Sequence, residues 1–155
     1  MLPVEIYGDI ESVETRFLIL VCELKGTAYC LEPQRREGQP MMQHQGHPHH
    51  SLLAAGAYLD ARFPEVSLTP VVPAEVGLMW EWLVMPMADT SSSVTLLEAA
   101  LNEMPFLAGQ QRSLADLYWC AVLAESIEGS ARLTDWQERV MAAEELDDGL
   151  SAESE

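Results

Sequence analysis

The chain has 155 residues, 48% of them hydrophobic, and 25 acidic against 8 basic side chains give a formal net charge of -17. This length suits one domain, or two small domains that share an interface. The acidic balance argues against binding nucleic acid through its phosphates, which requires clustered Lys and Arg side chains. It is compatible with a basic protein partner, or with high solubility alone.

The three cysteines, Cys22, Cys30 and Cys120, lie far apart in the sequence and form no CxxC pair or disulfide framework. This usage is typical of proteins in a reducing cytosol. No apolar segment reaches the length of a membrane span, and the N-terminus has no basic region followed by an apolar one. We therefore expect a cytoplasmic protein with no membrane partner.

The N-terminal part of the chain predicts a βαβ unit. Val4–Tyr7 alternates apolar and polar residues, as a short strand does. The continuously apolar run Phe17–Val21 leads to Lys25 and Gly26, a cation and a glycine that are typical of a helix C-terminus. A second strand is expected at Ala28–Leu31. Strand, helix and strand over this length make one βαβ unit.

The pattern weakens in the next segment, which holds all the histidines. Gln34–Glu37 is too short for a helix. Dense imidazoles are able to bind Zn²⁺, Ni²⁺ or Cu²⁺, but no Cys or carboxylate stands at ligand spacing beside them. We prefer a solvated loop, with adventitious metal binding and a structural metal site as the other interpretations. The histidines are His44, His47, His49 and His50.

Helical spacing returns after Ser51, where apolar residues recur on one face until Pro64 ends the predicted helix. Pro73 suits the first position of the following helix. A loop is expected at Asp89–Ser93, and the next helix at Val94–Glu103.

The most apolar helix follows Ser113. Ser113 and Asp116 have the spacing of a capping box, in which each side chain bonds the other residue's amide. Leu117–Leu123 is apolar on nearly every side, and such a helix belongs at the centre of a domain. Thr134 and Gln137 have the spacing of a second capping box. The acidic residues after position 143 predict a frayed tail.

Three segments resemble the glutathione transferase-like superfamily: Leu24–Tyr29, Tyr58–Pro64 (Tyr-Leu-Asp-Ala-Arg-Phe-Pro) and Phe106–Asp116. The resemblance covers residues 4 to 143. It implies an α/β plus all-α fold whose N-terminal part has lost a helix. The implied organisation is a shortened thioredoxin-like domain at 1–64, a linker at 65–72, an all-helical domain at 73–143 and an acidic tail at 144–155.

The resemblance also implies which hydroxyl would act on a thiol. Ser12 falls where some transferase classes keep a catalytic Ser, and Tyr7 lies nearer the strand end. A hydroxyl at a helix N-terminus would hydrogen-bond a thiolate in the field of the helix dipole. The plainer interpretation, which we prefer, is that Ser12 is only the N-cap of its helix.

The glutathione site implied by the family is expected to survive only as remnants, which are Gln39, Pro40 and Ser51. Gln39 replaces the Val that precedes the family's Pro, and the residue before Ser51 is His50 instead of an acid. We therefore expect no cofactor, with glutathione as the alternative.

Within the superfamily, Leu68–Pro73 (Leu-Thr-Pro-Val-Val-Pro) resembles stringent starvation protein A. Those proteins are transcription regulators that bind RNA polymerase and lack transferase activity. Their functional surface carries Pro-His-Pro where this chain has Pro64, Glu65 and Val66. We expect a non-catalytic homodimer that acts through protein contacts, with RNA polymerase as the implied partner. The alternatives are a transferase-like enzyme that uses Ser12 or Tyr7 on a thiol, and a decayed copy without activity of its own.

Overall fold

A computed structural model describes residues 2–85, 90–124 and 130–142. Its strands are β1 (Val4–Tyr7), β2 (Tyr29–Glu32), β3 (Met42–His44) and β4 (His47–His49). The described residues form six helices: α1 (Val13–Lys25), α2 (Leu52–Arg62), α3 (Pro73–Val84), α4 (Thr90–Leu101), α5 (Leu114–Val122) and α6 (Ala131–Met141). No helix among them is long and apolar enough to cross a membrane. The predicted acidic tail lies outside the described residues.

The predicted βαβ unit is confirmed. β1 and β2 are parallel neighbours, with Val4 opposite Tyr29. Ser12 caps the N-terminus of α1, where its side chain accepts a hydrogen bond from the Thr15 amide, and Gly26 ends the helix at a φ of 68°. Positive φ favours glycine, so the Lys-Gly signal marked the end of this helix correctly.

The sheet has the order β2-β1-β3-β4, in which β3 is antiparallel to both β1 and β4. The prediction of a solvated histidine loop is therefore wrong. Residues 42–44 and 47–49 form a hairpin, and His44 is buried. The hairpin forms because Met42 and His44 alternate with Gln43, which places both on the face that packs against the helices. Residues 33–41 contain no helix, as the sequence predicts.

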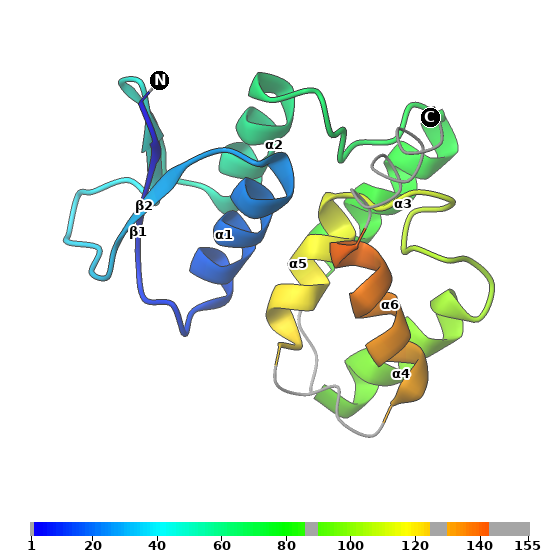
Figure 1. Ribbon diagram of the computed structural model, residues 1–155. Coiled ribbons are helices and arrows are strands. Elements are labelled where there is room, and N and C mark those ends of the chain that lie inside the picture. The colour runs from blue at the N-terminus through cyan, green and yellow to red at the C-terminus, as the bar shows by residue number, and fades with distance from the viewer. Residues whose placement is uncertain (1, 86–89, 125–129, 143–155) are drawn as a thin grey trace, which may run out of the picture.

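The other face of the sheet is polar. Val4 and Ile6 of β1 are buried, whereas Glu5 and Tyr7, which alternate with them, point away from the helices. Glu32 of β2 is exposed on the same side. Figure 1 shows α1 and α2 on one face of the sheet and no other described helix or strand on the opposite face. The side chains on that face are therefore suited to water, which is expected of a half-buried sheet.

The two halves meet where α1 packs against α5 (Figure 1). Lys25, at the end of α1, reaches the segment that joins the halves. Its Nζ donates to Asp60 Oδ1 at 2.6 Å, to the Phe63 carbonyl at 2.7 Å and to the Val66 carbonyl at 2.6 Å. Asp60 Oδ1 in turn accepts from the Leu68 amide at 2.8 Å. This buried network fixes the path of the chain between α2 and α3.

The predicted cap of α5 is confirmed, because Ser113 and Asp116 form a reciprocal capping box. Asp116 has further partners: its carboxylate accepts from the Leu107 amide at 2.9 Å and from Trp136 Nε1 at 2.8 Å. Burial raises the pKa of the Asp116 carboxyl, and the hydrogen bonds from Leu107, Trp136 and Ser113 act in the opposite direction. The cap therefore also joins α5 to the loop before it and to α6.

Two predicted helix starts are wrong. Helix α6 begins a turn before the predicted box at Thr134, with Ser130 as its N-cap. Ser130 accepts from the Leu133 amide and donates to Glu98 of α4, so a contact distant in sequence supports the earlier start. Helix α4 includes residues 90–93, which we expected in a loop. Packing of its apolar face overrides the weak helix propensity of Ser and Thr.

Candidate functional site

Ser12 is fully occupied by its capping role. Its hydroxyl accepts from the Thr15 amide at 3.2 Å, and its one hydrogen points to the Asp9 carbonyl or to Thr15 Oγ1, each at 2.9 Å. A catalytic Ser of the expected kind must instead donate that hydrogen to a thiolate. The N-cap interpretation is confirmed, and the catalytic role of Ser12 stays a prediction.

Tyr7 lies on the polar face of the sheet. Its hydroxyl donates to Glu5 Oε1 at 2.5 Å. That hydrogen bond, followed by burial and by the charges of Glu5 and Glu32, raises the pKa of Tyr7 to about 12. A raised pKa makes the phenol a poor source of phenolate and a weak donor to a thiolate. Its catalytic role also stays a prediction.

A polar pocket of about 440 Å³ lies on this face of the sheet. Glu5, Tyr7 and Glu32 line it from the strands, and Arg36 and Gln39 line it from the loop that follows β2. The loop is folded on itself, since Gln39 Oε1 accepts from the Arg36 amide at 2.8 Å. The pocket brings Tyr7 and Gln39 together but does not include Ser12, Pro40 or Ser51.

The residues beside the remnants Pro40 and Ser51 are joined by backbone hydrogen bonds at one end of the sheet. The Tyr7 amide donates to the Met41 carbonyl at 3.0 Å, and the Met41 amide donates to the His49 carbonyl at 2.9 Å. These bonds place the residue after Pro40 beside the strand that leads to Ser51. Ser51 itself is the N-cap of α2, with its Oγ 3.3 Å from the Ala54 amide. The Ser51 hydroxyl therefore already has a structural partner.

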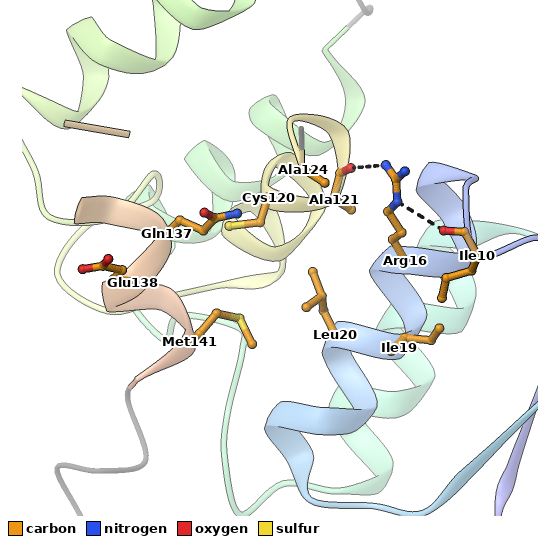
Figure 2. A pocket seen from close by; sticks show the side chains of 10 residues that line it. All are labelled: Ile10, Arg16, Ile19, Leu20, Cys120, Ala121, Ala124, Gln137, Glu138 and Met141. Carbon is orange, nitrogen blue, oxygen red and sulfur yellow. Dashed lines mark hydrogen bonds between the residues drawn. The ribbon is translucent and has the colours of Figure 1, made fainter. Parts of the chain in front are cut away.

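An apolar pocket of about 380 Å³ lies between the two halves. Figure 2 shows Leu20 of α1 facing Cys120 of α5 and Met141 of α6 across it. Arg16 borders the pocket, but its guanidinium donates to the carbonyls of Ile10 and Ala121 (Figure 2). Burial raises the pKa of the Cys120 thiol, so this sulfur is not poised as a nucleophile. The pocket is suited to apolar groups and offers no activated side chain.

The histidines are held together by packing. Three of them surround the ring of Tyr58 on α2, and the fourth, His50, is exposed. Among residues 2–85, 90–124 and 130–142, no group of three or more His, Cys, Asp or Glu side chains is arranged to hold a metal ion. The expectation of no metal at these imidazoles stays a prediction.

The residues of the expected partner surface lie on the segment between α2 and α3, and the role of that surface stays a prediction. Pro64 and Glu65 are exposed, and Val66 is half-buried with its carbonyl held by Lys25. Further along the same segment, the side chain of Val71 is 91% exposed. Sequence reasoning missed the Lys25–Asp60 network that holds the backbone of this segment. The available signal was that Lys25 is the only lysine in the chain.

No protein-family model matches the sequence, and no curated protein matches it either. Solved structures do match. The theta class glutathione S-transferase of Xanthomonas axonopodis pv. citri with glutathione bound has a TM-score of 0.71 at 18% identity, over 90% of this chain and 92% of that chain. The Bombyx mori glutathione transferase BmGSTD1 has 0.72 at 15% identity, over 94% and 90%. URE2P6 of Phanerochaete chrysosporium has 0.67 at 16% identity, over 90% and 93%.

Likeness at these identities shows the fold. The chain has a glutathione transferase-like fold, made of a shortened thioredoxin-like part and a helical part, and the expected fold class is confirmed. The boundaries of the predicted domains stay a prediction. Nothing in the comparisons points to the stringent starvation protein A subgroup.

Proposed function

We propose that this protein is a non-catalytic member of its fold class that acts through protein contacts. One observation carries the proposal: both candidate hydroxyls, on Ser12 and Tyr7, are already hydrogen-bonded within the chain. Catalysis by a hydroxyl needs a donor preorganised toward the reacting atom. Neither side chain offers one without first breaking a bond that stabilises the fold.

Electrostatics also disfavour a glutathione thiolate on the polar face. Glu5 and Glu32 both raise the pKa of Tyr7 there, so the local potential is negative. Glutathione carries two carboxylates, which like charges repel. Arg36 is the cation that lines the pocket, and it lies in a loop instead of on a rigid element. These features weigh against the alternative of a transferase-like enzyme.

The polar sheet face weighs against the alternative of a decayed copy. Loss of a covering helix from an ordinary domain would expose apolar side chains. Here the strands present Glu5, Tyr7 and Glu32 to that side, and Gln43 of β3 is opposite Glu5. Polar side chains on the face that lacks a covering helix keep the sheet compatible with water. This is expected of a protein whose fold is still in use, and it is not expected of a decayed copy.

The proposed partner surface consists of Pro64, Glu65 and Val66, and the implied partner is RNA polymerase. The Lys25 network holds the backbone of this surface in place, which lowers the cost of ordering it on binding. Exposed acidic and apolar side chains suit a partner that offers basic and apolar groups. Glutathione remains the alternative ligand, because a protein of this fold has been determined with glutathione bound.

The test runs a pull-down with RNA polymerase beside retention on glutathione resin. We expect polymerase to be recovered, no retention that free glutathione reverses, and no conjugation of glutathione to an aryl halide. Glu65→Lys should reduce recovery by at least about tenfold, since charge reversal at an interface costs more than 1.4 kcal/mol. Glu103→Lys, an equal change at an exposed site, is the control.

Three results would count against parts of this proposal. If the pull-down recovers no more RNA polymerase than an unrelated acidic protein does, the polymerase is not the partner. If Glu65→Lys and Glu103→Lys reduce the recovery of polymerase equally, the proposed surface is not the binding site. If the protein conjugates glutathione to an aryl halide, and Ser12→Ala or Tyr7→Phe lowers that rate, the protein is a transferase-like enzyme instead.

We also propose that the protein forms a homodimer through α3. Trp80 and Val84 are 37% and 60% exposed and lie four residues apart, so they form an apolar stripe on this helix, and Val72 at its N-cap is 47% exposed. Gly77 beside the stripe has open space where a Cβ would lie, which allows another helix to approach closely. A stripe on one helix is self-complementary about a two-fold axis.

Light scattering should therefore give the mass of a dimer. Trp80→Glu should convert it to a monomer, because a charge would be buried unpaired at the interface. Glu81→Gln, at the next position and off the stripe, should leave the dimer intact. A monomeric unsubstituted protein would contradict the proposal.

A further inference from the structure

Hairpin β3–β4 is attached to the rest of the chain by few bonds. β3 is registered with β1 at only two positions, where Glu5 is opposite Gln43 and Ile6 is opposite Met42. β4 is an edge strand, and its other neighbour is α2. The hairpin is therefore held by this short pairing with β1 and by the packing of its side chains on α2.

That packing is centred on the ring of Tyr58. The ring centroids of His49, His44 and His47 lie 4.7, 5.8 and 6.3 Å from it. His44 is 1% exposed, its Nδ1 is 2.7 Å from the Tyr58 hydroxyl, and its ring lies 5.6 Å from that of Phe63. An imidazole in such a place is suited to the neutral form, which pairs one nitrogen and leaves the ring uncharged.

His44 and His49 each have one ring nitrogen without a hydrogen-bond partner in the described part of the chain. Nε2 of His44 and Nε2 of His49 are buried without a hydrogen-bond partner among the described residues. A contact with the backbone of Leu2 favours the charged form of His44. This contact does not have the geometry of an ordinary hydrogen bond, so within the described chain His44 Nε2 has no such partner. In the charged form both ring nitrogens of an imidazole are donors, so each Nε2 would be a buried donor without a hydrogen bond of ordinary geometry, which is costly.

We propose that His44 and His49 lock hairpin β3–β4 onto Tyr58 while they are neutral, and release the hairpin when they take up protons. The charged groups that face them act in the same direction. Arg62 of α2 and His47 repel a charged His44, and His47 and His50 repel a charged His49. Glu5 of β1 offers no compensation, since it lies on the opposite face of the sheet.

The direction of the pH dependence follows from burial, which lowers the pKa of both His44 and His49. In the released hairpin each imidazole takes up a proton near its ordinary pKa of about 6.5. Packing of the hairpin therefore contributes stability above that pH, and the contribution is lost as the pH falls through the lowered values. Release would uncover Met42, Leu59 and Phe63 and would free one edge of β1. A free strand edge with apolar surface beside it is suited to a partner that adds a strand.

Hydrogen exchange of residues 41–50, corrected for the chemical exchange rate, tests the lock between pH 7.5 and 5.5. We expect the opening equilibrium to rise with acidity, by up to about tenfold per pH unit for each imidazole that takes up a proton. His44→Phe combined with His49→Phe should abolish this dependence, and His50→Gln should retain it. Peptides from α5 should stay protected throughout, which shows that the helical half remains folded.

Two further measurements keep the test decisive if the double variant does not fold. Tyr58→Phe, which removes the hydroxyl next to His44 Nδ1, should speed exchange of the hairpin at pH 7.5. NMR titration should show pKa values of His44 and His49 below the ordinary value of about 6.5. Equal protection of the hairpin at both pH values, or ordinary titration of both His44 and His49, would overturn the proposal.

Discussion

Lys25→Met is expected to destabilise the protein by about 3–5 kcal/mol, which is a large part of the stability of an ordinary domain. The Lys25 side chain is fully buried, and its ammonium is bonded to Asp60 and to the carbonyls of Phe63 and Val66. Met fills a similar volume but leaves a partly buried carboxylate and two carbonyls without their donor. The free energy of unfolding in urea measures the effect.

Arg35→Met is the matched control, because it removes a cation that is exposed. It should change the free energy of unfolding by less than about 1 kcal/mol. A second measurement uses the fact that Lys25 is the only lysine. An amine-reactive reagent should modify it in urea but not in the native protein. Rapid native labelling, or a loss for Lys25→Met no larger than the control's, would contradict the described network.

Asp116→Ala is expected to cost a similar amount, about 3–5 kcal/mol. The substitution leaves the amides of Leu107 and Ser113 and the indole nitrogen of Trp136 buried without an acceptor. It therefore removes more than a helix cap. Ser113→Ala, which removes the other half of the capping box, should cost only about 1 kcal/mol.

Asp135→Ala provides the control, since this carboxylate is exposed on α6. Thermal or urea unfolding followed by tryptophan fluorescence is a suitable measurement, because Trp119 and Trp136 are both buried near the site. Equal losses for Asp116→Ala and Ser113→Ala would mean that the carboxylate acts as a cap alone. The contacts to Leu107 and Trp136 would then contribute little.

The success of the sequence predictions depended on how local each signal was. Strand β1, the cap at Ser12, the end at Gly26 and the capping box at Ser113 were all predicted correctly. Each of them depends on residues within a few positions of one another. The resemblance in Tyr58–Pro64 added the fold class, which local patterns do not carry.

The wrong predictions concern residues whose partners are distant. His44 looked like part of a polar loop, and pairing with β1 and packing on Tyr58 made it a buried strand residue. Helix α6 is capped by Ser130 instead of the predicted Thr134, because Ser130 contacts Glu98 of α4.

The sequence by itself determined the βαβ unit, the caps at Ser12 and Ser113, the missing helix between β2 and β3, and the positions of the candidate hydroxyls. These follow from spacing and propensity, which act over one or two turns of chain. The tertiary structure alone decided that the hydroxyls of Ser12 and Tyr7 are already bonded, and that Lys25 and Asp116 each join three segments. A hydrogen bond depends on atoms brought within 3 Å of each other, and periodicity along a chain does not specify which distant atoms will meet.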